Sequence, residues 1–178
     1  PLMGEYGASE PAEVLSLMRK SIYDEMVSNP QVLRDNRWAH TISLLRLAKE
    51  SQCRAALATM SYRQQATHVL RSLRLEESLD VVLTLEDVRE GKPDPGIYLL
   101  AARKLETPPE ECLVLEDSPN GVRAGTAAGM NVIAVATPFT IASLHTTLDL
   151  DDAWIVRRPE DLLEVVQRRI DEHSRSAH

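Results

Sequence analysis

The sequence is poor in aromatic residues, in cysteine and in positive charge. Phe, Trp and Tyr make up 4% of the 178 residues, so a buried core has to be built from Leu, Val, Ile and Ala. The net charge of -7 argues against a basic nucleic-acid-binding face, and we expect no nucleic-acid partner. No apolar run approaches the length of a bilayer span, so we expect no membrane partner.

The two cysteines do not indicate a disulfide framework. Cys53 and Cys112 each stand beside apolar residues, and we predict that both are buried thiols of a reducing compartment. The N-terminus also shows no signal-peptide pattern. Together these features predict a cytoplasmic protein.

The rest of the composition is ordinary for a globular protein. Hydrophobic residues make up 43% of the chain and charged residues 26%, which argues against disorder and fibrous classes. A chain of 178 residues is long enough for one domain, or for one domain with a small appendage.

Hydrophobic periodicity divides the chain into alternating helices and strands. The helical spacing predicts helices at 12–28, 38–50, 64–75, 95–105, 119–128 and 159–172. Short apolar runs predict strands at 54–59, 81–85, 112–115, 131–136 and 154–156. This alternation is typical of βαβ units, so we predict an α/β fold with a mainly parallel, Rossmann-like sheet flanked by helices. Ligands bind such sheets at the carboxyl ends of the strands.

Three polar segments follow predicted strands and are candidates for chemistry. The first is Thr59-Met60, where a hydroxyl and exposed backbone N–H groups could bind an anion. The alternative for Thr59 is a capping role at the start of the next helix. The second is Lys92, whose ammonium group could be held over a phosphate by a proline-rich turn, or could simply be a solvated lysine.

The third segment is the acidic pair Glu116-Asp117. Two carboxylates directly after an apolar strand are unfavourable unless a cation neutralises them. Mg²⁺ prefers such hard oxygen ligands and retains waters and phosphate oxygens in its coordination shell. The alternative is that Asp117 or Ser118 caps the helix starting near Pro119, and the two roles are compatible.

A hydroxyl, a lysine and an acidic pair, in this order on successive strand ends, resemble the haloacid dehalogenase-like (HAD) superfamily of phosphohydrolases. The most specific stretches are residues 91–98 (GKPDPGIY) and 113–130 (LVLEDSPNGVRAGTAAGM), which are similar to the branch of β-phosphoglucomutase and phosphoglycolate phosphatase. A flavodoxin-like or response-regulator-like domain would explain the alternation, but not the lysine and the acidic pair together.

The resemblance implies a role for each matching residue. Thr59 and Lys92 would be catalytic and bind the phosphoryl group, with the Met60 backbone assisting. Asp117 would be a Mg²⁺ ligand, and Glu116 a second acidic ligand, direct or through water. Further phosphate-site residues implied by the resemblance are Ser118 and Asn120.

The resemblance also exposes a missing part. The family begins with a strand ending in Asp-x-Asp-Gly-Thr, which carries the nucleophile, and nothing before Thr59 matches it. The only Asp-x-Asp, residues 149–151, follows no apolar strand, and we predict a solvated loop there. In the family the missing strand is central, so its absence would leave two strand edges unpaired unless a preceding segment or another chain supplied it, or the sheet had rearranged.

These observations lead to one favoured hypothesis and two alternatives. Residues 1–35 are predicted to be a remnant of a helical cap, and residues 36–178 the HAD-like core without its first strand. The favoured function is a Mg²⁺-dependent phosphatase of a small phosphorylated metabolite, inactive as written because the nucleophilic segment is missing. The alternatives are a non-catalytic domain that binds phosphate or a protein, and a phosphomutase.

Overall fold

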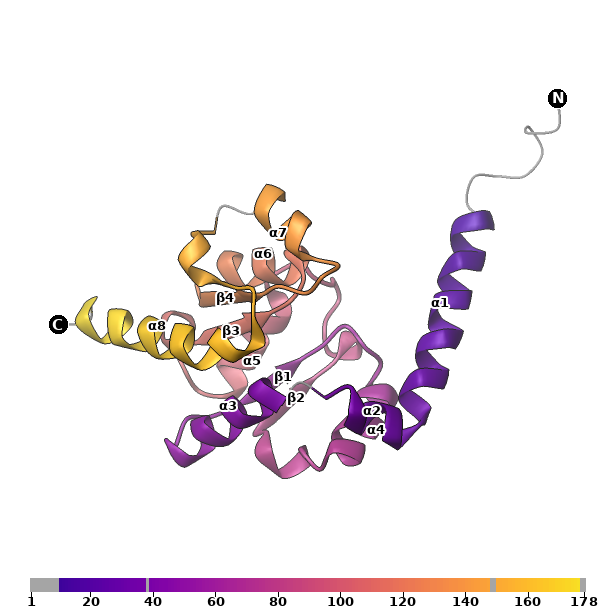
Figure 1. Cartoon of the computed structure of the whole chain (residues 1–178), viewed down its shortest axis with the longest axis horizontal. Coiled ribbons are helices and arrows are strands. Elements are labelled where there is room, and N and C mark those ends of the chain that lie inside the picture. The colour runs from indigo at the N-terminus through magenta and orange to yellow at the C-terminus, as the bar shows by residue number, and fades with distance from the viewer. Residues whose placement is uncertain (1–9, 38, 148–149, 177–178) are drawn as a thin grey trace. The chain divides into compact units, whose positions relative to one another are not determined.

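The computed structural model describes residues 10–37, 39–147 and 150–176 (Figure 1). The chain forms two compact units. The first comprises residues 1–37 and 64–76, and the second comprises residues 38–63 and 77–178. Among the described helices, none combines the length and apolar character that crossing a bilayer requires.

The first unit is helical. Its helices are α1 (Glu10–Ser28), α2 (Pro30–Asp35) and most of α4 (Arg63–Leu73). The α1 helix carries an exposed apolar stripe that includes Leu17, Met18 and Ile22. The assignment of residues 1–35 to a cap remains a prediction.

The Asn29-Pro30 pair follows the end of α1 and begins α2. The Asn29 side chain accepts a hydrogen bond from the Gln31 N–H at 2.9 Å, and Pro30 occupies the first helical position, where no N–H is needed.

The second unit contains the strands, and all its strand pairs are parallel. The strands are β1 (Ala56–Ala58), β2 (Val81–Leu83), β3 (Leu113–Glu116), β4 (Asn131–Val135) and β5 (Ile155–Val156). The helices of this unit are α3 (Ala39–Glu50), α5 (Gly96–Lys104), α6 (Pro119–Ala127), α7 (Ile141–Thr147) and α8 (Leu162–Ser176). The predicted α/β class with parallel strands between helices is confirmed.

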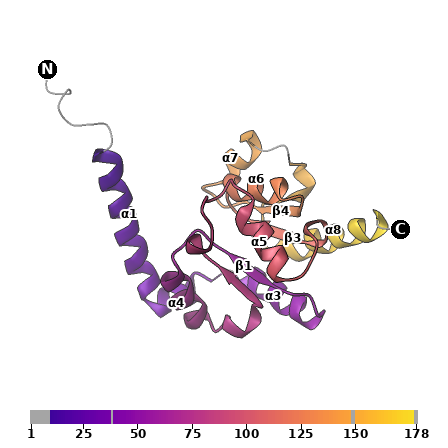
Figure 2. The ribbon, with the colours of Figure 1, turned by 180° about the vertical axis from the view of Figure 1, so that it is seen from behind.

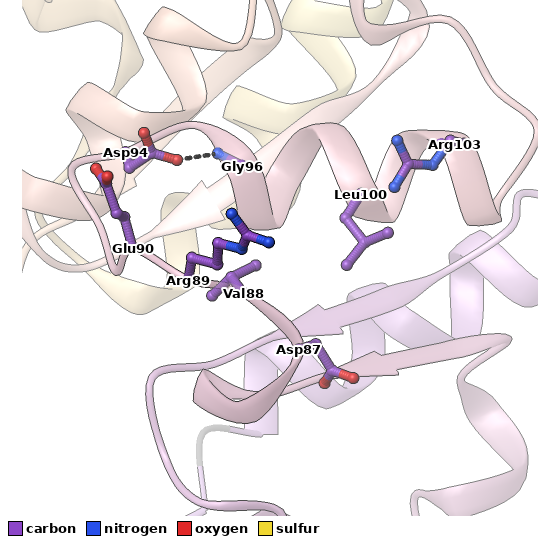
Figure 3. Close-up of a pocket in the computed structure, with 8 residues that line it drawn as sticks. All are labelled: Asp87, Val88, Arg89, Glu90, Asp94, Gly96, Leu100 and Arg103. Carbon is purple, nitrogen blue, oxygen red and sulfur yellow. Dashed lines mark hydrogen bonds between the residues drawn. The ribbon is translucent and has the colours of Figure 1, made fainter.

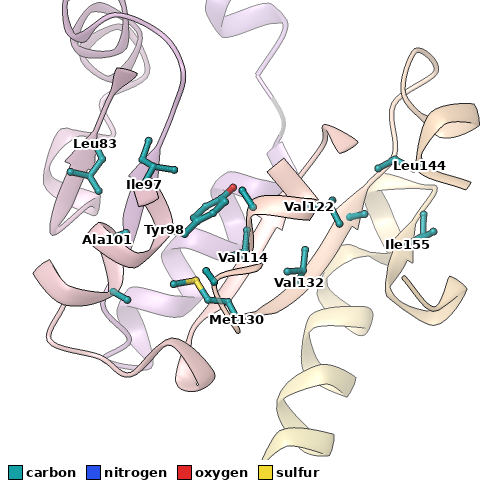
Figure 4. Close-up of a cluster of buried hydrophobic side chains, with 14 of the residues drawn as sticks. Leu83, Ile97, Tyr98, Ala101, Val114, Val122, Met130, Val132, Leu144 and Ile155 are labelled. Atoms are coloured by element: carbon teal, nitrogen blue, oxygen red, sulfur yellow. The ribbon is translucent and has the colours of Figure 1, made fainter. Parts of the chain in front are cut away.

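Helices cover both faces of the strands. On β4, Val132 and Ala134 point into the core cluster on the α5 and α6 side, whereas Ile133 and Val135 point into the cluster against α8. This alternation is the period of two of a strand buried on both faces. The helices α3 and α8 lie on the near side of the strands in Figure 1, and α5 lies on the near side in Figure 2. Figure 4 shows the cluster that includes Val132.

The strands form two sheets rather than the single sheet expected. One sheet has the order β1-β2 and the other the order β3-β4-β5. In parallel strands, successive residues direct their N–H and C=O groups to opposite edges. The Thr59 N–H donates to Leu83 on β2 at 3.0 Å, so the backbone groups of Ala58 face away from β2. Within the described residues, β1 and β3 are therefore end strands of two separate sheets.

Two further predictions concern the cysteines and the Asp-x-Asp segment at 149–151. Cys53 is exposed and Cys112 only half-buried, so the prediction of two buried thiols is wrong, although both are free thiols. Cys53 lies in the turn after α3, outside the apolar run that continues into β1. Of the Asp-x-Asp segment, Asp149 lies outside the described residues, whereas exposed Asp151 accepts a hydrogen bond from the Ala153 N–H at 2.9 Å.

Candidate functional site

The residues singled out in the sequence lie at the carboxyl ends of β1 and β3. Thr59 directly follows β1, and Glu116 is the last residue of β3. Lys92 belongs to the loop that precedes α5. Its ammonium group brings the two strand ends together, because it donates to the Ala58 carbonyl at 3.1 Å and also to Oε1 of Glu116.

Both the backbone N–H and the side-chain ammonium of Lys92 make hydrogen bonds. Its N–H donates to Sδ of Met60 at 3.3 Å, and its ammonium also donates to the Tyr98 hydroxyl at 2.9 Å. The same ammonium lies 4.6 Å from the centre of the Tyr98 ring. With Ala58, Tyr98 and Glu116 as acceptors, its three N–H bonds are all satisfied.

Glu116 is the most heavily hydrogen-bonded carboxylate of the site. Oε1 accepts from Lys92 and from the Tyr98 hydroxyl, the latter at 2.9 Å. Oε2 accepts from the N–H groups of Asp117 and Ser118, both at 3.0 Å, and from the Ser118 hydroxyl at 2.9 Å. A carboxylate has about four lone-pair positions, so these donors fill its capacity to accept hydrogen bonds.

Gly121 makes room for this carboxylate. A Cβ at position 121 would lie 1.9 Å from Cδ of Glu116. Glu116 therefore packs against the first turn of α6 at a point where the helix has no side chain. Ser118 caps the same turn by accepting from the Gly121 N–H at 3.1 Å.

The two adjacent acids have opposite electrostatic environments. Burial raises the pKa of Glu116, but the charge of Lys92 and the hydrogen bonds from Lys92, Ser118 and Tyr98 hold it below its usual range. Partial burial, followed by the charge of Glu116, raises the pKa of Asp117. Asp117 is exposed, and it is the acid whose charge the protein compensates less well.

Of the remaining predicted residues, Thr59 and Asn120 make local contacts, whereas Met60 contacts a residue far along the chain. The Thr59 hydroxyl accepts from the Ser61 N–H at 3.1 Å, which is a turn-capping contact. Asn120 is exposed and accepts from Arg123 at 3.3 Å. Met60 contributes its sulfur to the Lys92 backbone. Phosphate binding by Thr59, Met60 and Asn120 remains a prediction.

The donor set for a Mg²⁺ ion is small but chemically suitable. Among the described residues there is no cluster of three or more His, Cys, Asp or Glu side chains that could hold a metal. However, Mg²⁺ is commonly held by one or two carboxylates together with waters and substrate phosphate. Asp117, an exposed carboxylate with a raised pKa, fits one such position. Glu116 fits only an outer position through water, because its oxygens already accept hydrogen bonds.

A cleft of about 310 Å³ lies along α5 and the loop before it (Figure 3). Its walls contain acidic residues, two arginines and two aliphatic side chains, and the Asp94 carboxylate accepts a hydrogen bond from the Gly96 N–H at 2.8 Å. Neither Lys92 nor the acidic pair lines it. The cleft is therefore not the candidate site.

Sequence reasoning missed Tyr98 and Gly121. Both lie inside the two stretches that carry the family resemblance, but neither has a chemistry that periodicity or strand ends would reveal. Their roles depend on contacts with Glu116, which is 18 residues from Tyr98.

A model described as a haloacid dehalogenase-like hydrolase matches residues 10–129. The chain belongs to this family. As a haloacid dehalogenase-like hydrolase, it is 32% identical over 151 residues to the phosphorylated carbohydrates phosphatase of Thermotoga maritima, covering 84% of this chain and 64% of the relative.

Solved structures agree with this assignment. A hydrolase from Pseudomonas syringae matches with a TM-score of 0.68 and 25% identity, covering 93% of this chain and 72% of that one. CbbY from Rhodobacter sphaeroides in complex with xylulose 1,5-bisphosphate matches with a TM-score of 0.58 and 33% identity, covering 62% and 51%. This haloacid dehalogenase-like chain therefore spans under two thirds of the Thermotoga relative and about half of CbbY.

Proposed function

We propose that this chain carries the phosphate- and metal-binding half of a Mg²⁺-dependent phosphatase for small phosphorylated metabolites, sugar phosphates in particular. The observation that carries the proposal is the buried Lys92 ammonium, held between the ends of β1 and β3 and followed on the same edge by the exposed carboxylate of Asp117. A fixed positive charge and a metal-binding acid are what stabilise a transferring phosphoryl group. Support for the substrate class comes from the Thermotoga phosphatase and the CbbY complex.

Lys92 would bind phosphoryl oxygens. Its bond to the Ala58 carbonyl is the one that a phosphate oxygen would replace most readily, because a charged acceptor binds an ammonium more strongly than a neutral carbonyl does. Thr59 would assist, because a hydroxyl that accepts from Ser61 still has its own hydrogen to donate.

Asp117 would hold the Mg²⁺ ion. When bound, the ion would neutralise charge on the phosphoryl oxygens. Glu116 would keep Lys92 in place and fix the first turn of α6, with Ser118 shared between both tasks.

The reaction also needs a nucleophile, which the family takes from Asp-x-Asp-Gly-Thr. The chain as given has no such motif before Thr59, so we propose that it does not hydrolyse phosphate esters by itself. A strand between β1 and β3, from a preceding segment or another chain, would supply the motif. Two free cysteines suit a cytoplasmic location for the complete enzyme.

One observation favours a second function. All three N–H bonds of the Lys92 ammonium are already directed to protein acceptors, as in a structural clamp. On this alternative the chain is a non-catalytic domain that binds a protein, and Lys92 joins the two sheets without binding a phosphate.

Two measurements separate these functions. Titration calorimetry of this chain with inorganic phosphate, with and without Mg²⁺, should show binding that Lys92→Met abolishes and that Lys104→Met, on exposed α5 surface, leaves unchanged. The product of the complete reading frame should hydrolyse sugar phosphates only with Mg²⁺. Asp117→Asn should abolish this turnover, and Glu110→Gln should not. If this chain binds no phosphate and the product of the complete reading frame shows no turnover, the structural role of Lys92 is the one supported.

A further inference from the structure

Tyr98 lies in the first turn of α5 and contacts both members of the buried ion pair. Its hydroxyl accepts from Lys92 Nζ at 2.9 Å and donates to Glu116 Oε1 at 2.9 Å. Only 6% of the residue is exposed, and its ring belongs to the core cluster shown in Figure 4. The hydroxyl is thus a buried polar group whose two partners are both charged side chains.

Packing does not explain this hydroxyl. A phenylalanine would fill the same part of the core and would avoid the desolvation of a phenol. The ring also lies under the ammonium, 4.6 Å from centre to nitrogen, and a phenylalanine ring would keep that contact. What the hydroxyl adds is one acceptor for Lys92 and one donor for Glu116.

These two hydrogen bonds restrict a side chain that is otherwise flexible. A lysine has a four-carbon stem and three rotatable donors, whereas a tyrosine ring has two side-chain torsions and is fixed here by burial. The other acceptors of the ammonium are Ala58 and Glu116. If phosphate displaces the Ala58 carbonyl, the ammonium keeps two acceptors, Glu116 and Tyr98. The Tyr98 hydroxyl is the one that the packing of an α5 side chain in the core holds in place.

We propose that Tyr98 is a positioning residue that holds the Lys92 ammonium against Glu116 at the place where phosphate binds. This role rests on the proposed function for its ligand. It acts through Lys92 and Glu116, and Tyr98 itself does not touch the phosphate.

The first test is Tyr98→Phe, measured by titration with inorganic phosphate and, separately, with Mg²⁺. Phosphate affinity should fall about tenfold, in keeping with loss of hydrogen bonds to charged groups. Mg²⁺ affinity should stay within about twofold, because Asp117 is not touched by the change. Tyr23→Phe on α1 removes the same hydroxyl from an exposed tyrosine and should change neither affinity. A merely structural role would lower both affinities together, through the folded fraction, or neither.

The second test needs no ligand. Reductive methylation of the chain, followed by peptide mass spectrometry, reports the accessibility of each lysine. Tyr98→Phe should raise the labelling rate of Lys92 several-fold relative to exposed Lys104 at the end of the same helix. If the wild-type chain binds no phosphate but Lys92 labelling still rises in Tyr98→Phe, then Tyr98 does position Lys92 and the proposed phosphate function is wrong.

A double-mutant cycle keeps the proposal testable if Tyr98→Phe lowers the folded fraction. Glu116→Gln should itself expose Lys92 to labelling, and adding Tyr98→Phe should then change the rate by less than about twofold, because Tyr98 acts partly through that carboxylate. Equal labelling of Lys92 in wild type and in folded Tyr98→Phe, with equal phosphate affinity, would overturn the proposal. Additive effects of Tyr98→Phe and Glu116→Gln on the labelling rate of Lys92 would also overturn it.

Discussion

Lys92 and Glu116 form an ion pair in which each side chain is only 8% exposed, although one precedes α5 and the other ends β3. The lysine also reaches the carbonyl of Ala58 at the end of β1. This pair therefore links the carboxyl ends of strands that belong to two separate sheets.

Removing the lysine should destabilise the chain strongly. Lys92→Met keeps the length of the side chain but leaves Glu116 buried without its cation, which costs about 3–5 kcal/mol for comparable pairs. Urea unfolding should show this loss, and Lys104→Met should change stability by under about 0.5 kcal/mol. Adding Glu116→Gln to Lys92→Met should recover part of the loss. A stability equal to wild type in Lys92→Met would show that the pair is not formed in solution.

Gly121→Ala tests the space that Glu116 occupies. Helix propensity alone predicts that alanine should stabilise α6 by about 1 kcal/mol. The structure predicts the opposite, a loss of about 2 kcal/mol by overpacking, because the new Cβ would lie 1.9 Å from Cδ of Glu116. Thermal unfolding distinguishes the two signs. Thr126→Ala, at an exposed position of the same helix, is the matched control, and a stabilised Gly121→Ala variant would contradict the assigned position of the carboxylate.

Asp87 should give the chain an acid-sensitive contribution to stability. Its carboxylate accepts from the backbone N–H of buried Thr84 at 2.7 Å and from the Thr84 hydroxyl at 3.0 Å. The Thr84 backbone hydrogen bond, aided by the Thr84 hydroxyl and Arg63, holds the pKa of Asp87 below its usual value of 3.8. The contribution is therefore complete above that value and disappears as the pH falls through the lower folded-state pKa.

The variant Asp87→Asn keeps an acceptor but removes this titration. Its stability deficit relative to wild type should be present at pH 7 and should shrink below about pH 4. Denaturant unfolding at several pH values measures the difference. Glu86→Gln is the matched control, because it removes the same charge from the neighbouring exposed carboxylate. A deficit for Asp87→Asn that stays constant down to pH 2 would contradict the assignment.

The two cysteines should react at different rates. Cys53 is exposed, whereas burial, followed by the charges of Glu110 and Glu111, raises the pKa of half-buried Cys112. Since the thiolate is the reactive form, a colorimetric disulfide reagent should modify Cys53 at least about tenfold faster than Cys112. The variant Cys53→Ser should lose the fast phase. Two equally slow thiols would show that Cys53 is covered in solution.

Much of the element order was predictable because the strands are short apolar runs between helical periods. The run at 131–136 gave β4 almost to the residue, since both faces of this strand are buried. The helix α7 was not predicted, because its seven residues are too few for a periodic pattern. The range of α8 was predicted within a few residues, and the structure shows that Leu162 and Val166 are buried whereas Leu163 is 52% exposed.

The candidate site was predictable as a set of positions but not as a set of partners. Thr59 and Glu116 could be placed at strand ends because parallel strands share one carboxyl edge. That Glu116 would accept from five donors, and so leave Asp117 as the exposed acid, depends on Lys92 and Tyr98, which lie 24 and 18 residues before it, and on the turn that begins α6. No spacing in the sequence contains that information.

The sequence by itself determined the α/β class, the order of the polar segments and the family, because these follow from local periodicity and from contiguous motifs. Only the tertiary structure separated the strands into two sheets and joined their ends through Lys92. It also placed Tyr98 and Gly121 against Glu116. The physical reason is that a buried charge must find its partners in space, and these partners come from segments that only the packing of α5 and α6 brings together.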